Sequence, residues 1–493
     1  MNRLRLGLVI GMLLFAWSAR ASDTYVASTG RLIIPAVVVD STVYTNVVVT
    51  VGSILAVGQG PPYGTCDSYD RATNQLTIPA VQAGTASYSN VLITINLQGL
   101  EVGGSLPAAN SPCQASPRNV LPMTVDAGPA AVLNAGIAET NIPFVSVTVC
   151  QPGTTTCQTI DHVLVDTGSS GLRIISSVLN NALTALPQIR DGSGNALAEC
   201  VVFASNVSWG SVRSADVQLG GETASAIPIQ VIGDPAFPLT PSSCTSQGPV
   251  ENTVATFGAN GVLGVSTFVQ DCGDACTSAS NSIYYTCPPA GCQTAGVALN
   301  QQLPNPVSQL VDDNNGVVLA LPAVPPYGTT IATGTLTLGI GTQGNNSLGN
   351  AVIYDLDMGT GNFTTVYNGQ TYYDSAFLDS GSNALFFPDS RIPACNSAGV
   401  AAGFDCPGVT LQLGATNLGY GNGHAGPVSF TVANAQNLFT LTPAYTAFSS
   451  LAGAPITGTL LFDWGLPFFY GKKVFTAFER STTPAGFGPY VAY

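Results

Sequence analysis

The sequence predicts a mostly-β protein in which two similar lobes follow a small β-repeat module. From about residue 120 to the end, short alternating apolar segments are separated by Gly, Pro, Asn and Ser, and the chain contains 54 Gly and 33 Pro. This spacing is typical of many short strands joined by turns. An apolar run followed by Asp-Thr/Ser-Gly-Ser occurs around Asp166 and again around Asp379, which indicates two matching lobes.

The first 21 residues (1–21) have the pattern of a secretory signal peptide. Arg3 and Arg5 form a basic start, an apolar core follows, and Ala19-Arg20-Ala21 is a small-x-small cleavage site. The apolar core is too short to cross a bilayer. We therefore expect an exported protein, in the periplasm, on the cell surface or secreted, with no membrane span once the signal is removed.

The charge of the chain argues against two classes of partner. The chain carries 13 Lys and Arg against 27 Asp and Glu, a formal net charge of −14. Nucleic acids and anionic membrane surfaces are both bound through basic patches, which this composition does not supply. We expect no nucleic-acid partner, and a monomer whose negative charge keeps it soluble outside the cell.

The 12 cysteines of an exported chain are expected to form disulfides. Eight of them lie close together in pairs: Cys150 and Cys157, Cys272 and Cys276, Cys287 and Cys292, and Cys395 and Cys406. The sequence does not pair Cys66, Cys113, Cys200 and Cys244. A zinc site is the alternative for the four cysteines between 272 and 292. Pro-Gly turns and the lack of a nearby histidine favour disulfides and no metal.

Residues 22–104 are predicted to form the β-repeat module. Residues 31–58 and 75–104 align with each other, and Ile34-Pro35-Ala36-Val37 matches Ile78-Pro79-Ala80-Val81. We interpret the module as two similar hairpins that serve as a structural appendage, with a binding or anchoring role as the alternative. A stretch rich in Pro, Ala and Ser then predicts a linker over 105–135. The two lobes are expected over 136–330 and 331–493.

Two strings carry the candidate chemistry, VLVDTGSSGL around Asp166 and SAFLDSGSNALFF around Asp379. In each, a buried apolar strand holds the aspartate rigidly at its end. The residues that follow supply a hydroxyl that hydrogen-bonds to the opposing loop, a turn glycine that brings backbone N–H groups near the carboxylate, and an orienting hydroxyl. These are Thr167 and Ser380, Gly168 and Gly381, and Ser169 and Ser382, respectively.

Two carboxylates that lie about 3 Å apart cannot both ionise, so the pair shares one proton and titrates as a unit. The charged member takes a proton from a bound water while the neutral member protonates the substrate carbonyl. This chemistry requires no metal, cofactor or covalent intermediate. Serine and metal hydrolase chemistries fit the chain less well, because His162 and His424 are its only histidines.

With both strings in place, residues from about 140 to 493 resemble the pepsin-like aspartic endopeptidases, bilobal β proteins with one Asp-Thr/Ser-Gly loop in each lobe. Further segments match that family in order: DVQLGG (216–221), GVLGV (261–265), GTLTLG (334–339) and KKVFTAFE (472–479). The resemblance implies that Asp166 and Asp379 are the catalytic pair and that the residues after them support the dyad. The whole chain is also similar to an uncharacterised group of exported bacterial proteins.

Three features depart from that family. Its flap carries a tyrosine, whereas an ungapped count back from the DVQLGG segment places Phe203 there, without a hydroxyl; Trp209 is a candidate to compensate. The segment LLFDWGLPFFYG (460–471) replaces the second apolar-apolar-Gly segment, and its Asp463 is either a third functional carboxyl or a hydrogen-bonded structural acid. Residues 22–130 contain no lysine, so masking of the dyad by a basic prosegment is not expected.

The sequence therefore predicts an exported aspartic endopeptidase that hydrolyses peptide bonds of peptide or protein substrates with an Asp–Asp dyad and an activated water. The alternative is a catalytically silent pepsin-like protein that binds or inhibits other molecules outside the cell, because fold does not determine function. His162, shortly before Asp166, is either a group that tunes the dyad or a surface or hairpin residue.

Overall fold

The computed structural model describes residues 118–204, 206–455 and 460–493, together with the strands β1–β9 between Asp23 and Pro107. The predicted signal peptide, Cys66 and Cys113 lie outside the described residues. Within the described part, no helix is both long and apolar enough to cross a membrane. Its α-helices are short: α1 (Ala130–Asn134), α2 (Ser242–Thr245), α3 (Val254–Phe257) and α4 (Ala435–Leu441). Strands dominate the rest, which confirms the mostly-β fold class.

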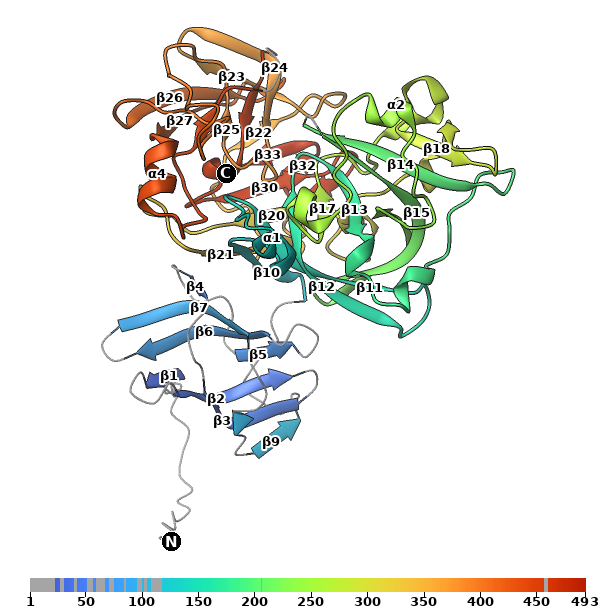
Figure 1. Ribbon diagram of the computed structural model, residues 1–493. Coiled ribbons are helices and arrows are strands. Elements are labelled where there is room, and N and C mark those ends of the chain that lie inside the picture. The colour runs from blue at the N-terminus through green and yellow to red at the C-terminus, as the bar shows by residue number, and fades with distance from the viewer. Residues whose placement is uncertain are drawn as a thin grey trace.

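The N-terminal module is one sheet, drawn in blue in Figure 1. Its strands are β1 (Asp23–Val26), β2 (Arg31–Val39), β3 (Thr42–Thr50), β4 (Ala56–Gly58), β5 (Asp67–Asp70), β6 (Gln75–Ala83), β7 (Ala86–Thr94), β8 (Leu100–Glu101) and β9 (Gly104–Pro107). Hairpins β2–β3 and β6–β7 have equal strand lengths. They bury equivalent positions: Leu32, Ile34, Val37, Val47 and Val49 in one, and Leu76, Ile78, Val81, Val91 and Ile93 in the other. The sequence repeat therefore corresponds to two hairpins that bury the same face.

Two large sheets form the rest of the molecule (Figure 1). A 15-stranded sheet contains β10 (Val120–Val125), β11 (Pro143–Cys150), β12 (Cys157–Asp166), β13 (Ser170–Ile175), β14 (Ala196–Phe203), β15 (Asn206–Leu219), β16 (Glu222–Ile232), β17 (Gly261–Val265), β18 (Tyr284–Cys287), β19 (Gln293–Thr294), β20 (Gly316–Ala320), β21 (Ala332–Leu338), β22 (Ile353–Asp355), β30 (Lys473–Ala477) and β33 (Tyr490–Ala492). A 7-stranded sheet contains β23 (Phe363–Tyr367), β24 (Gln370–Leu378), β25 (Leu385–Phe386), β26 (Leu411–Leu418), β27 (Ala425–Val432), β28 (Ala452–Gly453) and β29 (Phe462–Trp464). Strands β31 (Thr482–Thr483) and β32 (Gly486–Phe487) form a separate ribbon.

The strands that lead to the two aspartates are arranged alike. Strand β12 pairs in parallel with β17, and β17 pairs antiparallel with β13. In the second lobe, β24 pairs in parallel with β29, and β29 pairs antiparallel with β25. The register matches as well, because Val165 lies opposite Leu263 and Leu378 lies opposite Trp464. Each aspartate therefore lies at the end of a strand with the same pairing pattern, as the repeated string predicts.

Part of the expected linker belongs to the core instead. Within 105–135, residues 120–125 form β10, which pairs with β11 and β21, and residues 130–134 form α1. The side chains of Leu121, Met123 and Val125 are buried on one face of β10. The linker prediction is therefore wrong for residues 118–135, because a short apolar alternation follows the stretch rich in Pro, Ala and Ser.

Five disulfides lie within the described residues: Cys150–Cys157, Cys200–Cys244, Cys272–Cys276, Cys287–Cys292 and Cys395–Cys406. Four join cysteines that lie close together in the sequence. The bond between Cys200 and Cys244 spans 44 residues and ties β14 to α2, which spacing alone does not reveal. The zinc alternative is excluded, because all four of its cysteines are in disulfides and have no thiolate to offer.

Asn141 connects the start of the first lobe to separate segments of the second. Its side chain is fully buried, and its Nδ2 donates to the carbonyl oxygens of Asn383 and Phe448, each at 2.8 Å. Its Oδ1 accepts from the Phe448 N–H at 2.7 Å and from the Tyr470 hydroxyl at 2.9 Å. Its φ of 55° lies in the left-handed region, which asparagine tolerates better than most residues. This one side chain thus fixes the segment just after the second aspartate loop.

We expect Asn141→Ala to lower the free energy of unfolding by about 3 kcal/mol or more, because it leaves buried polar groups of Asn383 and Phe448 unpaired at about 1–3 kcal/mol each. Asn368 is the matched control, since its φ of 49° is similar but its side chain is exposed. Asn368→Ala should cost only about 1–2 kcal/mol. Urea unfolding measures both variants, and equal losses would contradict the role of the buried hydrogen bonds.

Candidate active site

The structure brings the two sequence-predicted aspartates together at the ends of the equivalent strands. Strand β12 ends at Asp166, and Asp379 directly follows β24. Asp166 and the adjacent Thr167 are each only 6% exposed, and Ser380 is fully buried. The polar groups of these three residues are therefore held away from bulk water, where each needs a partner within the protein.

Reciprocal hydrogen bonds join the two loops. The Thr167 N–H donates to Ser380 Oγ at 3.1 Å, and the Ser380 N–H donates to Thr167 Oγ1 at 2.9 Å. The Thr167 hydroxyl donates to the Leu378 carbonyl at 3.0 Å, and the Ser380 hydroxyl donates to the Val165 carbonyl at 2.7 Å. Each hydroxyl thus accepts one bond and donates another across the loops, so the two strand ends are held in a single geometry.

Each carboxyl group is oriented by its own loop. The Gly168 N–H donates to Asp166 Oδ1 at 2.7 Å, and the Ser169 hydroxyl donates to Asp166 Oδ2 at 2.5 Å. The second loop repeats the pattern around Asp379. There the Gly381 N–H donates to Oδ1 at 2.8 Å, and the Ser382 hydroxyl donates to Oδ2 at 2.8 Å. The two carboxyl groups are therefore held by the same kinds of donor in the same order.

The turn glycines bring each loop against the carboxyl group of the other. A Cβ atom added at Gly168 would lie 2.8 Å from Asp379 Oδ1, and one added at Gly381 would lie 2.7 Å from Asp166 Oδ1. Such contacts are too close for a carbon and an oxygen that are not bonded. Glycine is therefore required at both positions for the carboxyl groups to approach each other.

The surroundings of Asp379 favour its protonated form. Burial, the charge of Asp166 and a hydrogen bond between the two carboxyl groups raise the pKa of Asp379 to about 8. The hydrogen bonds from Ser382 and from the Gly381 N–H oppose this rise. Asp379 therefore keeps its proton at neutral pH.

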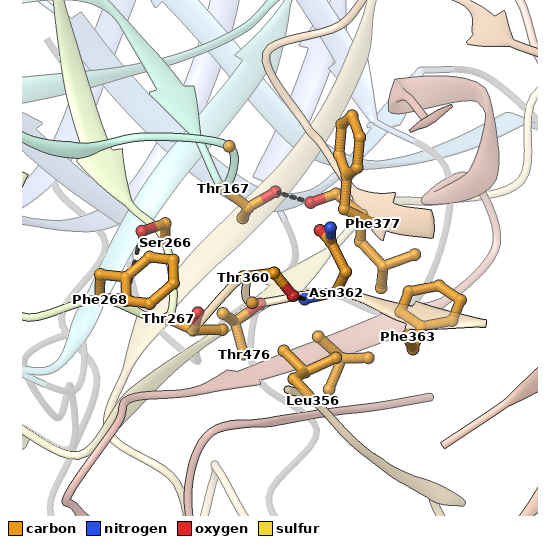
Figure 2. Close-up of a pocket in the computed structure, with 14 residues that line it drawn as sticks. Thr167, Ser266, Thr267, Phe268, Leu356, Thr360, Asn362, Phe363, Phe377 and Thr476 are labelled. Atoms are coloured by element: carbon orange, nitrogen blue, oxygen red, sulfur yellow. Dashed lines mark hydrogen bonds between the residues drawn. The ribbon is translucent and has the colours of Figure 1, made fainter. Parts of the chain in front are cut away.

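A pocket of about 210 Å³ opens beside the first aspartate loop and the end of β24 (Figure 2). Its lining includes Thr167 and Gly168 of the first aspartate loop and Phe377 and Leu378 at the end of β24. The rest of its lining carries no charge and consists of Ser266, Thr267, Phe268, Leu356, Thr360, Gly361, Asn362, Phe363, Thr476 and Val491. The pocket offers aromatic and aliphatic surface and several hydroxyl groups beside Thr167 and Gly168, although neither Asp166 nor Asp379 lines it.

Phe203, the flap candidate, is the last residue of β14 and is half-buried. Its ring centroid lies 5.7 Å from that of Phe257, and the Arg173 guanidinium lies 5.7 Å from its ring centre. Phe203 does not line the pocket, so its flap role stays a prediction. Trp209 is fully buried, and its Nε1 donates to the Phe237 carbonyl at 3.0 Å. Trp209 is therefore a core residue, and the idea that it replaces the flap tyrosine is wrong.

Arg173, on β13 just after the first aspartate loop, is a supporting residue that the sequence did not reveal. Its side chain is 1% exposed and forms ion pairs with Glu199 of β14 at 2.6 Å and with Asp271 at 2.9 Å. Burial and the neighbouring Glu199 raise the pKa of Asp271 well above its usual range. The network ties β13 to the β14–β15 hairpin. No local sequence pattern predicts this ion-pair network, because the partners lie 26 and 98 residues from Arg173 in the chain.

His162 and Asp463 have different relations to the dyad. His162 forms ion pairs with Asp161 at 2.7 Å and with Asp126 at 3.4 Å, rather than with the dyad. Although burial lowers the pKa of His162, these two acids raise it to about 10. Asp463, in contrast, is buried and interacts electrostatically with both members of the dyad. Among the described residues, no group of three or more His, Cys, Asp or Glu side chains is arranged to hold a metal ion.

We expect Thr167→Ala and Ser380→Ala each to lower the free energy of unfolding by about 2–4 kcal/mol, because each leaves buried groups of the opposite loop unpaired. Thr167→Ser keeps the hydroxyl and should stay within about 1 kcal/mol of the wild type. Thr476→Val is the matched control, since the Thr476 hydroxyl is buried without a partner. Chemical unfolding measures all four. A loss for Thr476→Val as large as that for Thr167→Ala would contradict the prediction.

Known proteins resemble the chain in structure and in sequence to different degrees. The crystal structure of an aspartic proteinase from Irpex lacteus matches it with a TM-score of 0.42 and 16% sequence identity, over 76% of this chain and 96% of that chain. No curated protein matches its sequence. The model of a family described as "Protein of unknown function (DUF3443)" matches residues 115–493. Because this match spans well over half of the sequence, the chain belongs to that family.

Proposed function

We propose that this chain is an exported aspartic endopeptidase in which Asp166 and Asp379 activate a water molecule to hydrolyse peptide bonds. The observation that carries the proposal is the reciprocal placement of the two carboxyl groups. Each faces the turn glycine of the opposite loop and is oriented by an N–H and a hydroxyl of its own loop. Two carboxyl groups in such a pair, with one proton between them, supply both the acid and the base of hydrolysis.

The protonation state of each aspartate defines its role, as acid or as base, in the first step of hydrolysis. Asp379 begins protonated, because burial and the charge of Asp166 raise its pKa. Asp166 takes a proton from the water as the water oxygen bonds to the substrate carbonyl carbon, and Asp379 gives its proton to the carbonyl oxygen. The resulting diol collapses when Asp166 protonates the amide nitrogen and the C–N bond breaks. Asp379 recovers a proton from a diol hydroxyl, so both carboxyl groups return to their starting states.

The pocket beside the loops supports a preference for uncharged side chains next to the cleaved bond. Its lining contains no ionisable group, and its apolar part includes Phe268, Phe363 and Phe377. A charged side chain placed there would lose its water without gaining a partner of opposite charge, which is costly. The hydroxyl groups of the lining leave room for polar but neutral side chains as well as apolar ones.

The disulfides support the exported location. Five disulfides in one chain are typical of proteins that fold in an oxidising compartment outside the cytoplasm. The substrates in our proposal are therefore peptides or unfolded proteins outside the cytoplasm.

We expect the purified protein to cleave an unfolded protein substrate at acid pH. Asp166→Asn and Asp379→Asn should each lower kcat by at least about 100-fold, because each removes one partner of the proton transfers. Activity should disappear as the pH rises through about 8, because Asp379 then loses the proton that it must donate. Assays of peptide release across the pH range measure both effects.

The control is Asp405→Asn. Asp405 is another buried acid, whose pKa is raised to about 6 by burial and by Asp389, and it does not belong to the dyad. Its variant should keep activity close to that of the wild type. Cleavage that survives in both dyad variants would disprove the proposal. If the wild type cleaves nothing at any pH but binds peptides, the chain is a catalytically silent binding protein instead.

A further inference from the structure

The pocket beside the first aspartate loop is lined by segments of both large sheets. Gly168 belongs to the loop after β12, whereas Phe363 and Phe377 belong to β23 and β24 of the 7-stranded sheet (Figure 2). Gly168 also faces the second carboxyl group, because a Cβ atom added at Gly168 would lie 2.8 Å from Asp379 Oδ1. A side chain that contacts Gly168 in the pocket therefore lies close to the dyad.

Phe268, another residue of the lining, is held on both sides by Glu479, two residues after β30. The Glu479 N–H donates to the Thr267 carbonyl at 2.7 Å. The Val269 N–H donates to Glu479 Oε1 at 3.2 Å. The residues directly before and after Phe268 are thus both fixed to one acid from a distant part of the chain.

The backbone of Phe268 itself is fixed to the first aspartate loop and to its own segment. The Ser170 hydroxyl donates to the Phe268 carbonyl at 2.6 Å, and the Phe268 N–H donates to Ser266 Oγ at 3.2 Å. All of these bonds use backbone groups of the segment or side chains other than the phenyl ring. The ring is therefore replaceable without the loss of any of them.

The phenyl ring of Phe268 lies against the backbone of Gly361, which also lines the pocket and precedes β23. A Cβ atom added at Gly361 would lie 2.9 Å from Phe268 Cε2 and 3.1 Å from Phe268 Cζ. These distances leave no room for another carbon atom between the ring and Gly361. The ring thus meets the opposite side of the pocket and sets its width there.

The volume of the pocket indicates which side chains fit. It measures about 210 Å³. An apolar cavity of about 150 Å³ is known to hold benzene. The pocket therefore has room for one six-membered ring with the carbon that carries it, whereas the two fused rings of tryptophan require more space.

We propose that Phe268 is a specificity-determining residue, a fixed ring that limits the side chain next to the cleaved bond to neutral groups no larger than that of phenylalanine. The inference rests on the proposed function and names its substrate class. Because Glu479 and Ser170 fix the segment, the ring does not withdraw for a larger occupant. A tryptophan side chain would overpack the pocket, and overpacking is costly in a closely packed environment.

The proposal is tested with peptides that carry either Phe or Trp on one side of the cleaved bond, in one series for each side. In the series whose variable side chain occupies the pocket, wild-type kcat/KM should be at least about tenfold higher for Phe than for Trp. Phe268→Ala should remove this difference, chiefly by raising kcat/KM for Trp, and Phe268→Leu should reduce it. Wild-type ratios near one in both series, or ratios that do not change in the variants, would overturn the proposal.

The matched control is Phe404→Leu. Phe404 is also half-buried and packs against Phe439, but it does not line the pocket. Phe404→Leu should keep the wild-type preference for Phe over Trp. A reduction as large as that in Phe268→Leu would mean that the preference follows general loosening of the fold and not the width of the pocket.

Glu479 is tested as the positioning residue of Phe268. Glu479→Gln keeps an acceptor oxygen for the Val269 N–H and should retain the preference for Phe over Trp. Glu479→Ala removes that acceptor and should lower the ratio of the two kcat/KM values by at least about threefold, because the ring is then less firmly held. Equal ratios in Glu479→Ala and Glu479→Gln would contradict the positioning role.

Binding of uncharged amino-acid derivatives separates this inference from the proposed function. Ligand-observed NMR should show that the wild type binds N-acetylphenylalaninamide more tightly than N-acetyltryptophanamide, and that Phe268→Ala loses this order. If the wild type cleaves no peptide but shows this binding order, the proposed function fails and the role of Phe268 stands. If it cleaves Phe and Trp peptides equally well in both series, the role of Phe268 fails and the proposed function stands. If Phe268→Ala does not fold, Phe268→Leu decides, since it keeps most of the buried volume.

Discussion

The reciprocal hydrogen bonds between Thr167 and Ser380 are the constraint on which the rest of the structure depends. Each hydroxyl comes from one lobe, and its partners come from the other, at 2.7–3.1 Å. These groups are buried, so neither loop moves without leaving several polar groups unpaired. The approach of Asp166 to Asp379 and the raised pKa of Asp379 both require the geometry that this contact sets.

The two aspartate loops make similar hydrogen bonds, but different residues stabilise each loop. In the first lobe, Arg173 pairs with Glu199 and Asp271 and ties the strand after the aspartate loop to a hairpin. In the second, Asn141 reaches across to the carbonyl of Asn383, just beyond the loop. Buried polar groups that are hydrogen-bonded across segments specify position more sharply than apolar packing does, because they tolerate little displacement. The near-symmetric dyad is thus built into an asymmetric molecule, and Asp463 adds a further difference on the side of Asp379.

Much of the fold could be predicted, because strands follow local alternation. The runs before Asp166 and Asp379 became β12 and β24, and the repeat in the N-terminal region became two equivalent hairpins. Predictions failed where a local pattern was short or where an aromatic residue had two plausible environments. Strand β10 was assigned to a linker, and Trp209 was considered a replacement for the flap tyrosine although it is a buried residue whose indole N–H donates to the Phe237 carbonyl.

The sequence by itself determined the strand-rich fold class, the two aspartate loops and the four short-range disulfides, since each depends on residues that are close together in the chain. Only the tertiary structure decided which distant groups meet: Cys200 with Cys244, Arg173 with Glu199, and Asn141 with partners 242 to 329 positions away. It also decided the environment of Asp463, because the charge state of an acid depends on burial and on neighbours that chain order does not specify.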